Sequence, residues 1–365
     1  MILDLYYARR FTQSFLLIGA VFLTLIMLID MIEQLRRFQN VDASFGQLFV
    51  LTMLNAPQAI SEILPLLMIL STIVMFVGLA RSSELVVTRA AGRSGIRALA
   101  APMAVAALIG VLAVSTLNPI VAATSNRYQQ LADTYRTGGT AVLSLSGEGL
   151  WLRQGSPEGQ SVIHATGYSN DPVTLYGVTI LTYAPNGGPV RRIMARTARL
   201  DGTDWVLRGA KVWPLEGGQN PETNATEFDV MRLATTLTRD RIRESLGSAS
   251  GISVYDLPST IRDLSQAGFS TKRYEIWYQV ELARPLFLIA MVLVGAAFTM
   301  RHTRFGGTGM SVLAAVMLGF TLYFIRNFAQ ILGENGQIPV ALAAWAPPIS
   351  AILLTWGLLL HSEDG

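Results

Sequence analysis

The sequence predicts a membrane protein of six transmembrane helices that carries an inserted, strand-rich domain between the third and the fourth. Three observations predict this class. Only 15% of the 365 residues are charged, against roughly 25% in soluble proteins. The apolar residues gather towards both ends of the chain, whereas residues 125–275 have an ordinary soluble composition. Within that middle part, apolar and polar residues alternate with the period of two that is typical of strands.

Six segments are apolar enough to cross a bilayer, which takes about 20 residues. The first follows Arg9 and Arg10, and we expect it to be a retained span because no small-residue cleavage site follows it. We interpret residues 44–56 as an interfacial or tilted extension, set apart from the second span by Pro57. The six predicted spans are residues 11–32, 60–80, 98–121, 280–300, 309–332 and 338–360.

The arginines of the short loops predict the orientation, because basic residues accumulate on the cytoplasmic side of membrane proteins. Placing the N-terminus inside puts eight of these arginines inside and only Arg36 and Arg37 outside. We therefore expect both termini in the cytoplasm and the inserted domain on the opposite side. The eight inner arginines are Arg9, Arg10, Arg81, Arg89, Arg93, Arg97, Arg301 and Arg304.

The inserted domain has the pattern of short strands joined by turns that contain glycine and proline. The alternating segment "VTLYGVTILTY" at 173–183 ends at a Pro-Asn-Gly-Gly turn, and "RRIMARTARL" runs to the hairpin signal Asp201-Gly202. Many short strands of this kind predict a sandwich, a jelly roll or an open barrel. Further strands are expected in "WVLRGAKVWPL" and in residues 140–153, 160–167 and 225–238.

A short helix, "DLPSTIRDLSQAG", is expected at the end of the inserted domain, with Asp256 at its N-cap and Gly268 closing it. The predicted organisation therefore has three parts. Residues 1–130 form the first transmembrane half, residues 131–268 form the inserted domain with its short helix, and residues 269–365 form the second transmembrane half.

The residues that most enzymes use for catalysis are scarce in the inserted domain. The chain has no cysteine, which excludes disulfides, thiolate metal sites and cysteine nucleophiles. His164 is the only histidine of the domain, and no second ligand stands at zinc-binding spacing from it. The motif G-x-S-x-G is absent, and acids such as Asp201, Asp204 and Glu216 fall in turns. We therefore expect neither catalytic nor metal-binding residues, and we interpret the domain as a docking domain whose edge strand accepts a partner's strand.

The segment "RSSELVVTRAAGRSG", residues 81–95, lies between the second and third spans on the predicted inner side. The chain has no G-x-x-x-x-G-K-[ST] motif, so energy for uphill transport has to come from a separate ATPase or an ion gradient. On a helix, Leu85, Val86 and Thr88–Arg89 set an apolar patch beside Glu84. Such a helix suits either a groove in a partner or an anchoring position at the membrane surface, and the residues alone leave both open.

This segment, the division of the spans into three and three, and the inserted β domain resemble the lipopolysaccharide export permease family, LptF and LptG, over nearly the whole chain. "KRYEIWYQ" before the fourth span and "GENGQIPVALAAWAP" before the sixth are more similar to the LptG branch. The resemblance implies a non-catalytic permease subunit of an ABC transporter. Such a subunit takes lipopolysaccharide from the inner membrane of a Gram-negative bacterium, and its inserted domain is a periplasmic, jelly-roll-like domain.

The resemblance also implies partners and cofactors. The permease would form a heterodimer with an LptF-like permease above a dimer of an LptB-like ATPase, and LptC-like and LptA-like proteins would continue a periplasmic bridge. ATP and Mg²⁺ would be bound by the ATPase, and this chain would hold no cofactor and bind no nucleic acid. Residues 81–95 would form the coupling helix, in which Glu84, Leu85, Val86 and Arg89 contact the ATPase.

A second group of residues is expected at the outer rim of a substrate cavity. Arg36 and Arg37 match basic positions that, in the family, meet the phosphates of the lipid; ordinary headgroup anchoring is the alternative. Arg326 lies inside the fifth span, where a charge normally faces a cavity or a partner. The family is expected to have a lysine at the position of Asp30, and this reversed charge favours an Asp30–Arg326 pair, within or between chains. The predicted rim consists of Arg36, Arg37, Arg326, Tyr323, Asp30 and Glu33.

Other classes of protein stay open at this point. A gradient-driven secondary lipid transporter has discontinuous spans with ion-coordinating acids near the midplane, whereas Asp30, Glu62 and Glu281 lie near the ends of spans. A membrane-anchored enzyme needs a catalytic cluster, and the sequence shows none. Within the resembled family, the LptF-type paralogue is the alternative. Co-purification with a soluble ATPase separates these classes.

Overall fold

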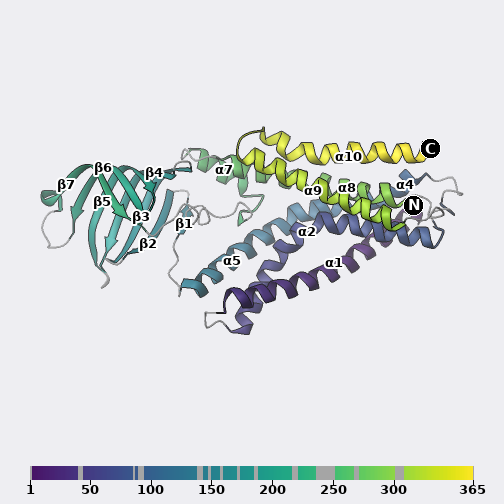
Figure 1. Cartoon of the computed structure of the whole chain (residues 1–365), viewed down its shortest axis with the longest axis horizontal. Coiled ribbons are helices and arrows are strands. Elements are labelled where there is room, and N and C mark those ends of the chain that lie inside the picture. The colour runs from purple at the N-terminus through teal and green to yellow at the C-terminus, as the bar shows by residue number, and fades with distance from the viewer. Residues whose placement is uncertain are drawn as a thin grey trace. The chain divides into compact units, whose positions relative to one another are not determined.

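The computed structural model shows two units, one of helices and one built on a sheet (Figure 1). The helical unit contains Met1–Ala132, Ser250–Leu257 and Lys272–Gly365, and the sheet unit contains Asp133–Ala249 and Pro258–Thr271. The residues that the structure describes are 2–39, 44–84, 87–88, 94–137, 143–146, 149–156, 159–170, 173–184, 188–215, 221–235, 251–266, 271–300 and 308–364.

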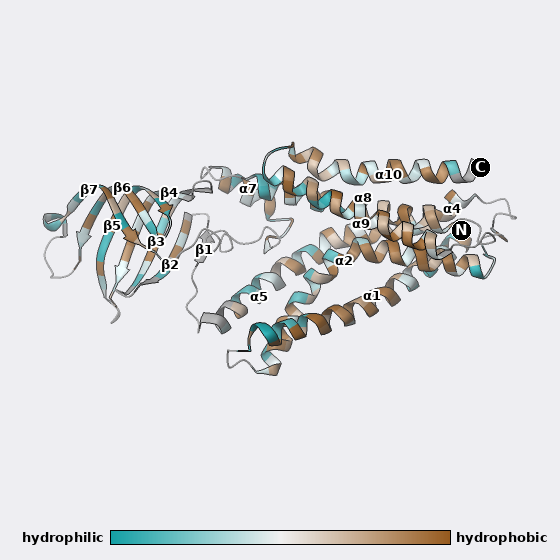
Figure 2. Ribbon diagram, in the orientation of Figure 1, coloured by the Kyte–Doolittle hydropathy of each residue, from teal (hydrophilic) through white to brown (hydrophobic). Residues whose placement is uncertain are grey.

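Six helical segments of the described chain are long and apolar enough to cross a membrane, which confirms this part of the predicted class. Figure 2 shows hydrophobic residues along most of their length. Each is longer than the predicted span, because hydropathy marks only the apolar middle of a helix and polar turns continue it. The helices are α1 (Ile2–Arg37), α2 (Phe45–Arg81), α4 (Gly95–Leu112) continued through a π-helical turn (Ala113–Leu117) into α5 (Asn118–Thr137), α8 (Lys272–Thr299), α9 (Thr308–Glu334) and α10 (Val340–Asp364).

α2 is one continuous helix, so the expected break at Pro57 is wrong and residues 45–56 are its first turns. Ser44 and Gln47 form a capping box that fixes the start. The Ser44 hydroxyl accepts a hydrogen bond from the Gln47 N–H, and the Gln47 side chain accepts one from the Ser44 N–H. Pro57 and Pro65 lie inside the helix. Proline is tolerated in spanning helices because neighbouring groups satisfy the carbonyl that it leaves without a donor.

α8 is the centre of the helical unit, where it packs against α2, α4, α9 and α10. In the most hydrophobic 18-residue stretch of α8, 67% of the residues are buried. The corresponding stretch of α1 has no buried residue. Two glycines permit close approaches to neighbouring helices. A Cβ on Gly110 would lie 2.5 Å from the Cα of Pro285, and a Cβ on Gly295 would lie 2.8 Å from the Cβ of Thr72. Small residues that let backbones approach are a usual basis of helix association in membranes.

The chain leaves the helical unit through α5 and returns to it at residues 251–257. Three hydrogen bonds join the returning segment to the outgoing one. They run from the Val254 N–H to Asn118 Oδ1 at 2.8 Å, from Asn126 Nδ2 to the Gly251 carbonyl at 2.8 Å, and from the Tyr255 hydroxyl to the Ser115 carbonyl at 3.0 Å. Ser115 belongs to the π-helical turn and Asn118 directly follows it, so this departure from the α-helical pattern holds the returning chain.

The sheet unit contains a seven-stranded antiparallel sheet in which every strand pairs with its neighbours in sequence. The predicted hairpins lie between β4 and β5 and between β5 and β6, and the predicted strand 140–153 is divided between β1 and β2. The predicted short helix is α7 (Leu257–Gln266), and Gly268 lies outside the described residues. The strands are β1 (Leu143–Ser146), β2 (Gly149–Ser156), β3 (Gly159–Asn170), β4 (Val173–Tyr183), β5 (Pro189–Asp201), β6 (Asp204–Pro214) and β7 (Thr226–Ala234).

The strand order corrects one detail of the predicted class while confirming an inserted β domain. A jelly roll contains Greek-key crossovers, whereas the described strands form a meander. The sheet curls in Figure 1, and one of its faces is apolar and buried. The cross-strand row of Leu152, Ile163, Ile180 and Ile193 is at most 1% exposed. The core of the domain therefore lies on that face.

Candidate functional site

Glu84 lies three residues beyond the end of α2, within the predicted coupling segment. Ser83 has a left-handed backbone (φ 58°), which ends the helix there. The Glu84 carboxylate accepts hydrogen bonds from the Tyr6 hydroxyl at 2.6 Å and from the Ser82 hydroxyl at 2.8 Å. The Arg10 guanidinium lies 3.8 Å from the same carboxylate, whose side chain is 34% exposed. The hydrogen bond from Tyr6 holds the pKa of Glu84 below its ordinary value, and the hydrogen bond from Ser82 and the charge of Arg10 act in the same direction. The carboxylate is therefore charged at neutral pH.

A second contact joins α1 to the same segment. The Thr88 hydroxyl donates to the Glu84 backbone carbonyl at 2.8 Å. Because a threonine hydroxyl carries one proton, the Tyr7 hydroxyl is the donor in its 2.7 Å bond with the Thr88 hydroxyl. Tyr7 and Thr88 are both buried. Three further predicted coupling residues, Leu85, Val86 and Arg89, lie outside the described residues.

The outer end of α1 carries the predicted basic rim. Glu33, Arg36 and Arg37 are all exposed there. Arg37 Nη1 donates a hydrogen bond to the Tyr128 hydroxyl at 3.2 Å. Buried Gln34 donates to the same hydroxyl at 2.9 Å. Arg37 therefore lies where α1 meets α5, and both rim arginines are exposed.

The structure does not form the predicted Asp30–Arg326 pair within the chain. Asp30 Oδ1 instead accepts a hydrogen bond from Asn55 of α2 at 2.8 Å. The Arg326 guanidinium lies 5.1 Å from the centre of the Phe287 ring and interacts electrostatically with Glu281. The reason is helix packing, since α1 packs against α2 and α4, whereas α9 packs chiefly against α8 and α10.

α8 carries a buried ion pair that the sequence reasoning did not single out. Glu281 is 0% exposed and Arg284 is 9% exposed. Arg284 Nη2 donates to Glu281 Oε1 at 2.5 Å, and its Nη1 donates to the hydroxyl of Ser61 on α2 at 2.6 Å. The other oxygen of Glu281 has no hydrogen-bond partner among the described residues. The pair therefore ties α8 to α2 inside the spanning region.

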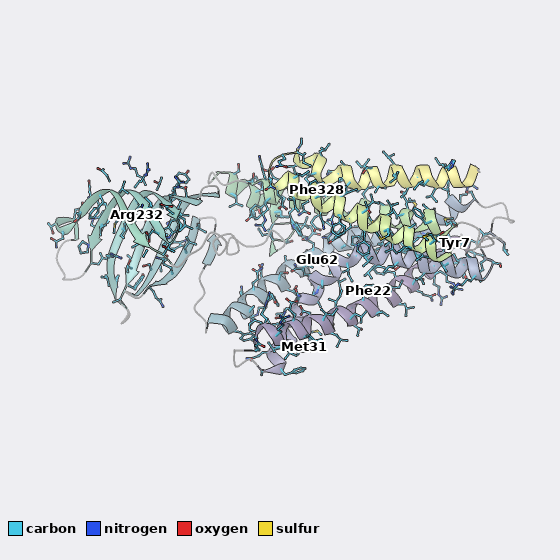
Figure 3. All side chains as sticks on the ribbon, viewed as in Figure 1. Tyr7, Phe22, Met31, Glu62, Arg232 and Phe328 are labelled. Atoms are coloured by element: carbon cyan, nitrogen blue, oxygen red, sulfur yellow. The ribbon has the colours of Figure 1, made fainter. Side chains whose placement is uncertain are left out.

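An apolar cavity of about 210 Å³ lies between α2, α8 and α9. Tyr323 lines it, which places this predicted rim residue at a cavity wall, and Tyr323 also interacts electrostatically with Arg326. Glu62, labelled on α2 in Figure 3, is the charged residue of the lining. The apolar walls are formed by Ile63, Leu66, Ile69, Met291 and Phe320.

Comparison with known proteins identifies the family of this chain. The family model "Lipopolysaccharide export system permease LptF/LptG" matches residues 5–361. The chain belongs to this family. It is 23% identical to LptG of Haemophilus influenzae over 95% of this chain and 97% of that protein. It is also 23% identical to LptG of Escherichia coli K12 over 99% of each. The protein is therefore a multipass permease of the lipopolysaccharide export system, and the resemblance inferred from residues 81–95 is confirmed.

The contacts of this permease that sequence reasoning missed come in two kinds. Glu281 and Arg284 had a local signal, an acid and an arginine one helical turn apart in an apolar run. Tyr6 and Tyr7 had none, because their partners lie 78 and 81 residues away in the chain.

Proposed function

We propose that this permease is the membrane subunit of an ATP-driven transporter that lifts lipopolysaccharide out of the inner membrane of a Gram-negative bacterium. A separate, LptB-like ATPase dimer binds ATP and Mg²⁺ and docks on residues 81–95. The permease itself is non-catalytic and holds no cofactor. The family assignment supports the export role, and the environment of Glu84 is the observation that carries the docking site.

Glu84 suits docking because its carboxylate is charged, held in place and accessible. Tyr6 and Ser82 fix the carboxylate by hydrogen bonds, and 34% of the side chain stays exposed. A side chain that is already ordered loses less conformational entropy when a partner binds. A cation on the ATPase would form a charge-assisted hydrogen bond with it, which is the stronger class of hydrogen bond.

A second, LptF-like permease is proposed to cover α1 and α9. The most hydrophobic 18-residue stretch of α1 has no buried residue, and in that of α9 only 17% of the residues are buried. Large apolar side chains such as Leu17 on α1 and Phe328 on α9 are more than half exposed. Because the family comprises LptF and LptG, a heterodimer of the two is the assembly that we propose for these faces.

The substrate is proposed to contact the rim and the cavity described above. Exposed Arg36 and Arg37 suit the phosphates of lipopolysaccharide, because guanidinium groups bind phosphate through paired hydrogen bonds. The apolar cavity that Tyr323 lines suits part of an acyl chain. Arg326, which interacts electrostatically with Tyr323, brings a positive charge near that wall.

The sheet unit is proposed to lie in the periplasm and both termini in the cytoplasm, which the distribution of arginines supports. The two edges of the described sheet are β1 and β7. β7 exposes Phe228 and Val230, and an edge strand with exposed apolar side chains suits the addition of a strand from another protein. LptC-like and LptA-like proteins of the periplasmic bridge are the proposed partners there.

Co-purification of the ATPase with tagged permease tests the proposal. Glu84→Ala is expected to weaken ATPase binding about 10- to 100-fold, because a charge-assisted contact contributes about 1.5–3 kcal/mol. The variant is expected to insert normally and to lose lipopolysaccharide release. Glu222→Ala is the matched control, since Glu222 is also a hydrogen-bonded, exposed glutamate but belongs to the sheet unit.

Two outcomes contradict the proposal. Wild-type recovery of the ATPase together with wild-type lipopolysaccharide release by Glu84→Ala would exclude the docking role of this residue. Transport that requires an ion gradient and proceeds without any bound ATPase would exclude the ATP-driven mechanism and favour a secondary transporter.

A further inference from the structure

α1 is a single helix that connects the two candidate regions of the permease. It runs unbroken over the 36 residues Ile2–Arg37, which makes it roughly 54 Å long at 1.5 Å per residue. It contains no proline, which is among the main causes of sharp kinks. A displacement of one end that does not bend the helix therefore also moves the other end.

The inner end of α1 is attached to the coupling segment by a chain of side-chain hydrogen bonds. Arg10 Nε donates to the Tyr6 oxygen at 2.9 Å, and the Tyr6 hydroxyl donates to Glu84 at 2.6 Å. Next to this chain, the Tyr7 hydroxyl bonds Thr88 at 2.7 Å in a buried position. Two consecutive tyrosines of α1 therefore hold Glu84 and Thr88, four residues apart in the segment.

The outer end of α1 is attached separately. Gln34 donates to Tyr128 of α5 at 2.9 Å, and Asp30 accepts from Asn55 of α2 at 2.8 Å. Figure 3 shows Tyr7 and Met31 near opposite ends of α1. Among the described residues, the buried side chains of α1 are Tyr7, Phe11 and Gln34, which lie near its two ends. The residues between them are half-buried or exposed.

We propose that α1 carries movement of the coupling segment to the outer rim, and that Tyr6 and Tyr7 are the positioning residues that latch the helix to that segment. The inference rests on the proposed function, because it needs an ATPase that acts on Glu84. When a cation of the ATPase approaches the Glu84 carboxylate, it shares that carboxylate with Tyr6 and Arg10. The segment and the first turns of α1 then move together, and the displacement reaches Arg36 and Arg37.

Distances between two nitroxide labels test this latch in the purified complex, reconstituted in lipid nanodiscs. The chain has no cysteine of its own, so Leu35→Cys on α1 and Leu342→Cys on α10 provide the label sites in this subunit. Both side chains are exposed. The distance distribution is measured without nucleotide and after trapping with ATP and vanadate, and a complex without the two cysteines provides the background.

The test variant is Tyr6→Phe with Tyr7→Phe, which removes two hydroxyl groups and keeps both rings. We expect the wild-type distance distribution to shift on trapping and the variant to lose this shift. Lipopolysaccharide released per ATP should fall at least about fivefold, the factor expected from one net hydrogen bond. Recovery of the ATPase should fall less than in Glu84→Ala, because the double variant keeps the Glu84 carboxylate itself and the hydrogen bond from Ser82. Tyr278→Phe is the control, because no hydrogen bond of the Tyr278 hydroxyl is found among the described residues.

Hydrogen exchange of the permease without the ATPase gives a second readout. The Val87 N–H bonds the Ser83 carbonyl, and its exchange should accelerate about fivefold or more in the double variant if the latch holds this turn. A latch that only stabilised the fold would accelerate exchange in the variant but leave the nucleotide-dependent shift in place, and that result overturns the proposal.

The remaining outcomes separate this inference from the proposed function. If the wild-type complex binds and hydrolyses ATP but the labels do not move, the role of α1 is wrong and the export function stands. If no ATPase assembles on the wild-type permease, the proposed function fails and the inference fails with it. A shift of wild-type size in the double variant refutes the latch alone.

Discussion

Removing the guanidinium of Arg284 leaves the Glu281 carboxylate in the spanning region without the cation that contacts it. Glu281 is 0% exposed, and its second oxygen already has no hydrogen-bond partner among the described residues. Arg284→Ala also removes the donor to the Ser61 hydroxyl. Two polar groups of different helices thus lose their partner in one substitution.

The expected loss of stability follows from these contacts. Removing one partner of a buried ion pair costs about 3–5 kcal/mol, because the remaining charge is uncompensated. Arg326 interacts electrostatically with Glu281 and offsets part of this, so we expect about 3 kcal/mol for Arg284→Ala. Replacing both partners with apolar residues, Glu281→Leu with Arg284→Met, should be more stable than Arg284→Ala, since it removes the uncompensated carboxylate and leaves only Arg326 of this group of charges.

Reversible unfolding in bicelles, measured by steric trapping, gives these free energies. Arg273→Ala is the control on the same helix, because Arg273 is exposed, and it should change the stability by no more than about 0.5 kcal/mol. The reasoning is refuted if Arg284→Ala is as stable as this control. It is also refuted if the apolar double variant is less stable than Arg284→Ala.

Three further predictions concern the sheet, the rim and the helix packing. Hydrogen bonds from Lys211 and Trp213 lower the pKa of Glu222, so this stabilisation is present above the ordinary carboxyl range and is lost in acid, below about pH 4. A fluorescence titration should show this transition of Trp213, and Glu222→Gln should lack it. Arg36→Glu with Arg37→Glu should lower lipopolysaccharide release more than basal ATP hydrolysis, and unchanged crosslinking of the substrate would exclude the rim assignment. Gly110→Ala should lower the free energy of unfolding of the permease by about 1–3 kcal/mol, because the new Cβ overpacks against the backbone of Pro285. Gly357→Ala should not, because its new Cβ meets no atom within 4 Å, and equal stabilities of the two variants would contradict the packing.

Features that depend on neighbouring residues in the sequence were predictable. Hydropathy located all six spans, since the transfer of a helix into lipid depends on its own residues. Alternation and turn residues located the strands on either side of Asp201-Gly202. The same local rules failed at Pro57, because the groups that keep α2 helical there belong to the fold around it.

Contacts between distant residues were not predictable in the same way. The Asp30–Arg326 pair was inferred from depth in the membrane, yet depth does not say which helices are neighbours. The alternation of β2 to β6 fits a jelly roll and a meander equally, because strand order is a property of the whole sheet. The bonds of Tyr6 and Tyr7 depend on where α1 passes the end of α2, and a tyrosine near the start of a helix carries no sign of this.

The hydrogen bonds between the outgoing α5 and the returning residues 251–257 affect how much the inserted domain can change in length or sequence between related proteins. Asn126 bonds the Gly251 carbonyl at 2.8 Å, and Ala132 lies six residues further along the same helix, roughly 9 Å away at 1.5 Å per residue. The stretch Asp133–Ala249, which is the larger part of the insertion, therefore leaves and re-enters the helical unit at neighbouring points. A closed junction of this kind lets the insertion lengthen, shorten or be exchanged for another domain while the helices keep their places.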